Sequence, residues 1–410
     1  MNKEMLEKYA ELIVKVGLNL QEGQRLFVMA EMDTAPLVRA VTAKAYQNGA
    51  PYVMVLWEDE ELKRIRQEFA PHDSFEEFPG WIMDGLLHDA KRGDAFLSVK
   101  GTDPDLYAPY DPELVGIALK ARAKLFRPAQ EFISNGGVQW TVVCPPTPKW
   151  AAKIFPEVSE EEAVEKLWEE MVKLCRLDKD DPKNFWKNYL ADLGKRHNYL
   201  TEKQFETLHF RGPGTDLKIG MPEKHIWKGG GGTSQGGVDF TANIPTEEVF
   251  SMPHKYKVDG TVHSTKPLNH YGNLIDNFSL TFEKGLVVAY SAEVGEEALK
   301  NILESDENAK RLGEVALVPH RSPISESGLI FYNTLYDENA ACHLALGSAY
   351  RENVQGGLEF SDEEMDAAGI NDSLIHVDFM IGSDKIDLDG ITPDGSVIPL
   401  MRQGEWAFDV

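Results

Sequence analysis

His376 and Asp378 stand two residues apart in the apolar segment 373–382, which reads as a β-strand. Successive side chains of a strand alternate between its two faces, so the imidazole and the carboxylate of this H-x-D triplet point the same way. Aspartate is uncommon in strands, and both side chains carry polar atoms that are costly to bury without partners. The triplet therefore predicts either a structural His–Asp hydrogen bond or a pair of metal ligands.

Two further segments carry acids beside apolar runs. Glu247 and Glu248 follow Thr246 in what reads as a tight turn or a helix N-terminus, where capping is the simpler interpretation. Glu314 stands at the entrance of a short apolar strand, 315–318, where an acid is often only solvated. Neither segment indicates a functional site by itself, so the interpretation of these acids depends on the other candidate residues.

The segment 336–350 is rich in small residues and is predicted to be a helix. His343 and Tyr350 lie seven residues apart, on one face of that helix. Together with the acids and the H-x-D pair, they would supply the nitrogen and oxygen ligands that suit divalent ions. Two such ions about 3.5 to 4 Å apart stabilise both the attacking and the leaving group in hydrolysis. The set indicates hydrolytic chemistry, although spacing alone leaves the assembly open.

The chain that must position these residues has 410 residues, enough for two or three domains. Its first part alternates strands and helices, which predicts an open, mostly parallel α/β sheet domain over 1–180. The strands expected there are 25–30, 51–57, 95–99 and 139–144, with helices over 35–48 and 112–125. Neither G-x-G-x-x-G after the first strand nor a P-loop motif occurs, so this layout does not indicate a nucleotide.

A break at 178–182 interrupts a charged helical stretch and marks the expected start of a second domain, 181–410. Beyond residue 208 the chain is rich in glycine turns and β segments, which predicts a larger, mixed α+β domain that carries the metal site. The glycine run 228–237 lacks the residues of a phosphate cradle and is predicted to be a flexible surface loop or lid. The fold class is therefore α/β, with two domains.

Composition excludes several classes of partner. The net charge is −25, from 67 acidic and 42 basic residues, and so negative a surface repels nucleic acid and anionic lipid. No apolar run approaches the roughly 20 residues of a membrane span. The charged amino terminus and the three widely spaced cysteines predict a cytoplasmic protein with reduced thiols.

Four segments taken in order resemble one family. They are 243–250 (NIPTEEVF), 312–319 (LGEVALVP), 338–347 (ENAACHLALG) and 375–382 (IHVDFMIG). They resemble the aminopeptidase T/aminopeptidase S family of thermophilic-type bacterial metallo-aminopeptidases. The resemblance implies a two-domain, cytosolic and commonly homodimeric exopeptidase with two divalent metal ions (Zn²⁺, Co²⁺ or Mn²⁺). Its substrates would be peptides with a free amino terminus.

The resemblance also assigns roles to residues. The positions that match the family's metal ligands are Glu248, Glu314, His343, His376 and Asp378. Tyr350 matches an active-site tyrosine, and we expect it to donate a hydrogen bond to the developing oxyanion. Glu247 is a candidate general base, although a solvated capping acid is an equally good interpretation, and an oxygen of Glu314 is a second candidate.

Three histidines follow the first ligand in the sequence, at positions 254, 263 and 270. His254, His263 or His270 could help to position substrate, although surface histidines are the simpler interpretation. The ligand types themselves do not fix the reaction, because a non-catalytic metal-binding protein and a dinuclear phosphohydrolase would use the same ones. Both of these functions therefore stand beside the peptidase.

Overall fold

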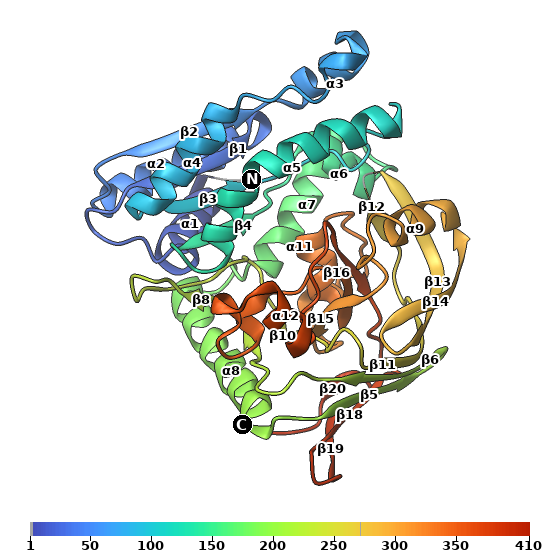
Figure 1. Cartoon of the computed structure of the whole chain (residues 1–410). Coiled ribbons are helices and arrows are strands. Elements are labelled where there is room, and N and C mark those ends of the chain that lie inside the picture. Colours follow the sequence, from blue (N-terminus) through green and yellow to red (C-terminus); the bar gives the residue numbers. More distant parts are fainter. Residues whose placement is uncertain (1–2, 271) are drawn as a thin grey trace. The chain divides into compact units, whose positions relative to one another are not determined.

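The computed structural model describes residues 3–270 and 272–410 (Figure 1). The chain forms two compact units, Met1–Asn188 with Gly231–Pro245, and Tyr189–Gly230 with Thr246–Val410. The helix α8 (Pro182–Lys203) carries the chain from the first unit into the second. Segment 231–245 then rejoins the first unit, an excursion that a single boundary near residue 180 does not describe.

The first unit is built on a four-stranded parallel sheet in the order β2-β1-β3-β4. Its strands are β1 (Leu26–Glu31), β2 (Val53–Glu58), β3 (Ala95–Val99) and β4 (Trp140–Val143). Its helices are α1 (Lys3–Leu12), α2 (Ala35–Gln47), α3 (Glu60–Phe69), α4 (Gly80–Arg92), α5 (Pro112–Ser134), α6 (Pro148–Ile154) and α7 (Glu160–Leu174). The predicted open parallel α/β sheet is confirmed.

Local signals in the sequence set several helix ends in this unit. The Ser159 hydroxyl accepts the backbone N–H of Glu162 at 3.3 Å, and three glutamates fill the first turn of α7. Acids at that position complement the helix dipole. At its C-terminus, α4 ends at Gly93, whose φ of 99° is a left-handed conformation that glycine adopts without strain.

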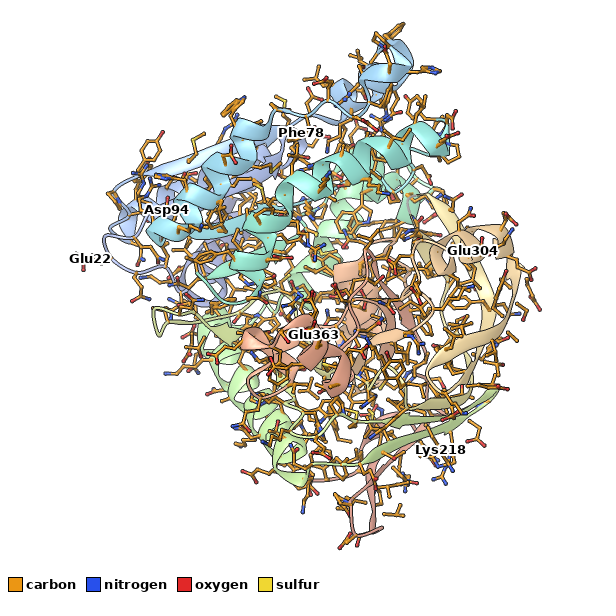
Figure 2. All side chains as sticks on the ribbon, in the orientation of Figure 1. Glu22, Phe78, Asp94, Lys218, Glu304 and Glu363 are labelled. Atoms are coloured by element: carbon orange, nitrogen blue, oxygen red, sulfur yellow. The ribbon has the colours of Figure 1, made fainter. Side chains whose placement is uncertain are left out.

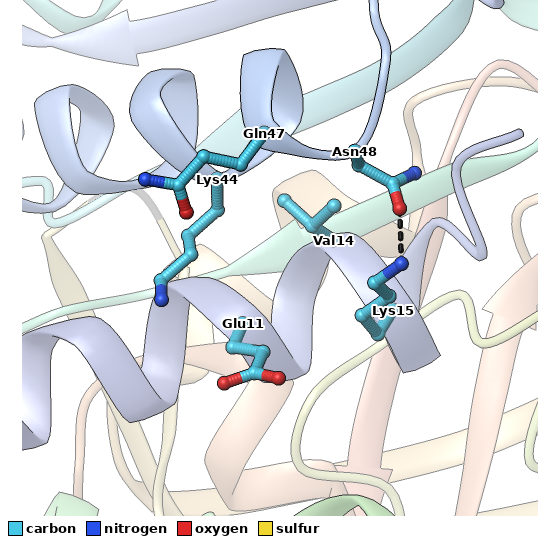
Figure 3. Close-up of a pocket in the computed structure, with 6 residues that line it drawn as sticks. All are labelled: Glu11, Val14, Lys15, Lys44, Gln47 and Asn48. Carbon is cyan, nitrogen blue, oxygen red and sulfur yellow. Dashed lines mark hydrogen bonds between the residues drawn. The ribbon is translucent and has the colours of Figure 1, made fainter. Parts of the chain in front are cut away.

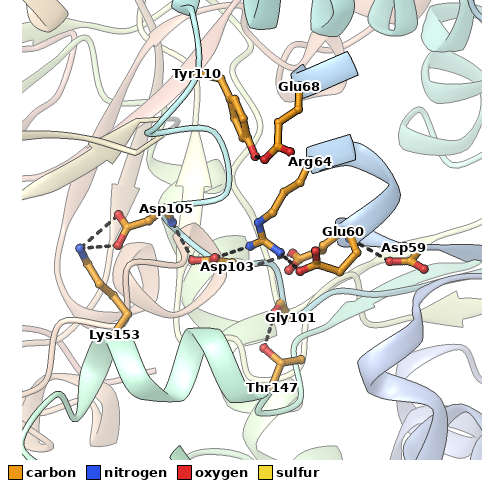
Figure 4. A network of polar contacts seen from close by, with 11 residues as sticks. Asp59, Glu60, Arg64, Glu68, Gly101, Asp103, Asp105, Tyr110, Thr147 and Lys153 are labelled. Atoms are coloured by element: carbon orange, nitrogen blue, oxygen red, sulfur yellow. Dashed lines mark hydrogen bonds and ion pairs between the residues drawn. The ribbon is translucent and has the colours of Figure 1, made fainter. Parts of the chain in front are cut away.

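The carboxyl edge of this sheet is the place where open α/β sheets commonly bind ligands. Here the chain's own polar groups occupy it (Figure 4). Glu31, at the end of β1, accepts the Gly101 N–H at 2.8 Å, and Glu60 accepts the Asp103 N–H at 2.9 Å. Arg64 pairs with Asp103 at 2.6 Å. This network joins α3 to the loop after β3.

A small surface pocket of about 120 Å³ lies beside α1 and α2 in the same unit (Figure 3). Its lining residues are Glu11, Val14, Lys15, Lys44, Gln47 and Asn48. The Lys15 ammonium donates a hydrogen bond to the side-chain oxygen of Asn48 across it. The pocket contains none of the candidate metal ligands, so it does not mark the reaction site.

The second unit contains two antiparallel sheets. The five-stranded one, in the order β17-β16-β15-β10-β7, consists of β7 (Lys228–Gly229), β10 (Val249–Ser251), β15 (Leu312–Leu317), β16 (His343–Gly347) and β17 (His376–Met380). The nine-stranded one consists of β5 (Thr207–Gly212), β6 (Thr215–Gly220), β11 (Val258–His263), β12 (Leu268–His270), β13 (Asn273–Glu283), β14 (Leu286–Val294), β18 (Asp387–Ile391), β19 (Val397–Arg402) and β20 (Glu405–Trp406). Its helices beyond α8 are α9 (Glu296–Leu303), α10 (Pro323–Glu326), α11 (Thr334–Asp337) and α12 (Asp362–Ala368). The predicted mixed α+β region is confirmed.

The hydrophobic core of this unit lies on one face of the five-stranded sheet. Val315, Leu344, Val377 and Phe379 belong to this buried cluster, and the ring of Phe379 lies 5.5 Å from that of Phe278 in the other sheet. Because side chains alternate along a strand, the residues next to these in sequence project from the opposite face. The candidate metal ligands occupy that opposite face.

The glycine run 228–237 is more ordered than the predicted flexible loop. Lys228 pairs with Phe250 at the start of the run, and β8 (Gly232–Thr233) pairs with β9 (Asp239–Phe240). Gly231 has φ of 150°, and a Cβ there would stand 1.9 Å from the Phe240 carbonyl oxygen. The glycines thus permit close backbone approach, which is a second reason for such a run.

Candidate metal centre

All five candidate ligands come together on one face of the five-stranded sheet. Ligand atoms of Glu248, Glu314 and His343 lie within 4.8 Å of one another, and so do those of Glu314, His376 and Asp378. The strands β15, β16 and β17 are adjacent, with Ala316 opposite His343 and Ala345 opposite Asp378. Glu314 belongs to both triads, so the arrangement contains two adjacent candidate sites with a shared carboxylate.

The expected helix over 336–350 is wrong, although His343 does lie among the candidate ligands. The chain forms α11, then a 3₁₀ turn over Glu338–Ala340, and then the central strand β16. Both edges of β16 are paired, with β15 and β17, and all of its residues are buried. Small residues fit a crowded central strand as well as a helix, and pairing with distant segments decided between them.

Two backbone carbonyls fix the orientation of the histidines. His343 Nδ1 lies 3.2 Å from the Ala341 oxygen, and His376 Nδ1 lies 2.7 Å from the Ser348 oxygen. A carbonyl oxygen only accepts, so each Nδ1 carries the proton in the neutral ring and leaves a lone pair on Nε2. This pattern, with the remote ring nitrogen bound to a carbonyl, is typical of metal-ligating histidines.

The lone-pair nitrogens face carboxylate oxygens at distances that suit a cation between them. His343 Nε2 lies 3.2 Å from Glu248 and 3.3 Å from Glu314, and His376 Nε2 lies 3.5 Å from Glu314 and 3.4 Å from Asp378. The buried Oε2 atom of Glu248 accepts no hydrogen bond from any group that the structure describes. A divalent ion in each triad would satisfy these atoms. The residues present therefore fit the predicted metals.

The electrostatics of the cluster favour positive charge. Burial opposes the imidazolium form of His376, but the charges of Asp378 and Glu314 outweigh it and raise its pKa to about 10. In the same way, burial opposes and the neighbouring carboxylates raise the pKa of His343 well above its usual range. Burial raises the pKa of Glu314, with nearby acids adding to the shift. A metal ion meets the same demand for positive charge that these protons meet.

Glu338 is a fourth carboxylate at the centre that sequence reasoning missed. Burial raises the pKa of Glu338 well above its usual range, and the charges of Glu248 and Asp378 raise it further. The residue opens the segment 338–347 that carried the family resemblance, so the signal was present. Spacing along an expected helical face selects His343 and Tyr350 and passes over Glu338.

Tyr350 lies beside the second triad. Its ring centre is 5.3 Å from that of His376 and 5.9 Å from that of Phe250, and 38 % of its surface is exposed. Dense protein around the hydroxyl raises the pKa of Tyr350 well above its usual range, and the charges of Glu314 and Asp378 add to this. The phenol is therefore a neutral hydrogen-bond donor throughout the physiological range.

Glu247 is not the solvated capping acid that was one of its two interpretations. It is 1 % exposed, and no helix begins there because the chain enters β10 instead. The Tyr189 hydroxyl donates a hydrogen bond to its carboxylate, and its backbone N–H donates to the Asn339 side-chain oxygen at 2.6 Å. Asn339 directly follows Glu338, so this contact ties the Glu247–Glu248 segment to the fourth carboxylate.

The three other candidate histidines lie outside both triads. The His254 ring lies 6.0 Å from the Tyr256 ring in a tilted arrangement, and His263 Nε2 lies 2.7 Å from the side-chain oxygen of Asn277. Burial lowers the pKa of His270 to about 4, so that ring is neutral at physiological pH. The structure gives these three residues no place among the candidate ligands.

Comparison with known proteins places the whole chain in one family. The profile of the thermophilic metalloprotease (M29) family matches residues 2–406. Aminopeptidase 2 of Geobacillus stearothermophilus is 49% identical over 405 residues, covering 99% of this chain and 98% of that protein. Aminopeptidase T of Thermus thermophilus is 44% identical over 404 residues, which is 98% of each chain.

A solved structure agrees with the sequence comparison. Wild-type AmpT from Thermus thermophilus superimposes with a TM-score of 0.93 at 43% identity, covering 99% of this chain and 100% of that one. The fold, the grouped ligands and the relatives point the same way. This chain is a member of the thermophilic metalloprotease (M29) family.

Proposed function

We propose that this protein hydrolyses the first peptide bond of peptides with a free amino terminus, at a centre that holds two divalent metal ions. The family and the relatives show that this protein is a metal-dependent aminopeptidase. The proposal of a centre with two ions rests on the pair of ligand triads that share Glu314. The family match favours this reaction over an inert metal-binding protein and over a phosphohydrolase.

In this proposal each protein group has a separate task. One ion would be held by Glu248 and His343, and the other by His376 and Asp378. Glu314 would contribute to both sites. The bound ions would supply Lewis-acid chemistry and an activated water. Zn²⁺, Co²⁺ and Mn²⁺ all accept such a mixture of imidazole and carboxylate ligands.

Tyr350 and the acids around the centre would handle charge and protons. The Tyr350 hydroxyl donates a hydrogen bond to the carbonyl oxygen of the scissile bond as negative charge develops there. Glu338, whose pKa is raised by burial and by its acidic neighbours, is suited to take a proton from water and pass it to the leaving amine. Glu247 keeps its candidacy as base, but its buried contacts with Tyr189 and Asn339 also support a role in positioning Glu248.

We also propose that the protein is cytoplasmic and forms a homodimer. The structure describes no helix that is long and apolar enough to cross a membrane. Cys144, Cys175 and Cys342 are buried cysteines in the thiol form, which supports a reducing compartment such as the cytoplasm. We propose a homodimer as the assembly, supported by the exposed apolar side chains of α3.

The test combines metal removal with two variants. Chelator-stripped protein should release no amino acid from leucine p-nitroanilide or short peptides, and Zn²⁺, Co²⁺ or Mn²⁺ should restore release. Amino-terminal acetylation of the peptide should abolish cleavage. Metal analysis should find two ions per chain in the wild type, about one in Glu248→Gln and fewer than one in Glu314→Gln. Equal metal loss in both variants would contradict the shared role of Glu314.

A further inference from the structure

Lys266 is a half-buried lysine in the turn between β11 and β12. Among the residues that the structure describes, it has no hydrogen-bonding or ion-pairing partner. Burial lowers the pKa of its ammonium group, and the negative charge of Asp337 only partly opposes this. A partly desolvated cation without a partner is costly in free energy, so its position calls for a reason.

The turn that carries Lys266 is fastened to the strand of the metal centre. The Thr265 N–H donates to the Met380 carbonyl oxygen at 2.8 Å, and the Thr265 hydroxyl donates to the Gly382 carbonyl oxygen at 2.8 Å. Met380 ends β17, and it shares a strand face with His376 and Asp378 because the three are two residues apart. Lys266 therefore directly follows a residue that is hydrogen-bonded to the end of the ligand-bearing strand.

On its other side Lys266 is near the segment of the fourth carboxylate. The charged group that acts on it is Asp337, the residue immediately before Glu338. Asp337 is already engaged, since its two oxygens accept the Phe331 N–H at 2.8 Å and the Asn333 N–H at 3.0 Å. A lysine paired for structural reasons alone would close onto such an acid, and Lys266 does not.

We infer that Lys266 is a substrate-binding residue whose ammonium group receives a negatively polarised oxygen of the peptide. A lysine suits this task because it presents a compact charge and three donors on a flexible stem. One source is the carbonyl oxygen of the scissile bond, which becomes more negative in the transition state. The other source is the terminal carboxylate of a short peptide. The inference rests on the proposed hydrolysis and adds a residue to it.

The experiment compares Lys266→Met, Lys266→Arg and a control, Lys218→Met, in metal-loaded protein. Lys218 is an exposed lysine of β6 in the same unit, so its loss changes the net charge equally (Figure 2). Three substrates separate the two sources: leucine p-nitroanilide, Leu-Gly and Leu-Gly amide. Metal content and Tm are measured on every variant.

If Lys266 binds the scissile carbonyl, Lys266→Met should lose about 100-fold in kcat on all three substrates, with KM nearly constant. If it binds the terminal carboxylate, only Leu-Gly should suffer, through a rise in KM of about tenfold or more. In both cases Lys266→Arg should recover part of the loss, and Lys218→Met should match the wild type. Metal content and Tm should not move.

Binding without turnover gives an independent readout. By calorimetry, Lys266→Met should bind the tetrahedral phosphonate analogue of leucine at least about tenfold more weakly in the carbonyl case. In the carboxylate case, Lys266→Met should bind D-Leu-Gly more weakly than the wild type does, while its binding of D-Leu-Gly amide should not change. Wild-type rates on all substrates with unchanged binding would overturn the inference. Loss of metal or of Tm in Lys266→Met would also overturn it, since the residue would then be structural. A wild type that binds metal but cleaves no peptide would refute the proposed function instead, and the phosphonate would still test Lys266.

Discussion

At the scale of residues, the candidate centre is a set of buried polar and charged groups that lack other partners, within the described part of the chain, for some of their atoms. Glu248 has an oxygen without a hydrogen bond among the described residues, and both histidines turn lone pairs toward carboxylates. Such a cluster would be costly in an ordinary core. Cations bound on this face of the sheet would offset that cost.

Tyr350 gives a direct test of catalysis at this scale. Tyr350→Phe removes one hydroxyl and keeps the ring contacts with His376 and Phe250. We expect kcat to fall about 10²-fold to 10³-fold, because a donor to the developing oxyanion is lost. Metal content should equal that of the wild type, as measured by elemental analysis. Near-normal turnover would remove Tyr350 from the mechanism.

At the scale of elements, the alternation of strand faces separates chemistry from packing. Val315, Leu344 and Phe379 bury one face of the five-stranded sheet in the core, and the ligands occupy the other. A shift of one residue in register would exchange the two sets. The core therefore fixes the register on which the ligand geometry depends.

Gly347 shows how narrowly the end of β16 is constrained. Its φ is 101°, and a Cβ there would stand 2.2 Å from the Ile375 carbonyl oxygen. Gly347→Ala should lower the free energy of unfolding by more than about 1 kcal/mol, because strain and a clash act together. It should also weaken metal binding through His376, which pairs with Gly347. Denaturant titration and metal affinity test this, and Gly395→Ala is the control, with positive φ but no close atom.

Glu60, at the start of α3, predicts a pH dependence in the first unit. Burial, and then the charge of Glu31, raises the pKa of Glu60 to about 7 from its usual 4.5. A carboxyl with a raised folded-state pKa contributes stability that is present below its unfolded pKa and is lost as pH rises through the folded pKa. Glu60→Gln should therefore raise Tm relative to wild type at pH 8, and the difference should shrink toward pH 4.

The matched control for that experiment is Glu61→Gln. Glu61 follows Glu60 in α3 but is exposed. Its replacement should give a Tm difference that does not grow between pH 4 and pH 8. A Glu60→Gln effect of equal size at both pH values would show that the carboxyl is not titrating in the folded state.

At the scale of the whole molecule, the candidate ligands all belong to one compact unit. The other unit shows a different feature, since α3 has no buried residue and exposes Leu62, Ile65 and Phe69. These residues are spaced to lie along one side of the helix. Apolar side chains gathered in this way commonly mark a protein interface.

The proposed homodimer makes a prediction about mass. Light scattering should give about twice the chain mass of 45.9 kDa. Phe69→Glu should shift the mass toward that of a single chain while Tm changes little, because Phe69 is 76 % exposed and buries almost nothing. Lys218→Met serves again as the control. A monomeric wild type would contradict the proposed assembly.

The sequence alone determined what depends on local order. The H-x-D spacing placed His376 and Asp378 on one strand face, and alternating apolar segments predicted the parallel sheet of the first unit. The tertiary structure decided what depends on distant partners. His343 sits on a strand because β15 and β17 pair with both edges of β16. Glu338 lies in the 3₁₀ turn before β16, and the turn that carries Lys266 is hydrogen-bonded to β17 through Thr265. Local propensity carries no information about such pairing, so no spacing rule could have assembled these residues.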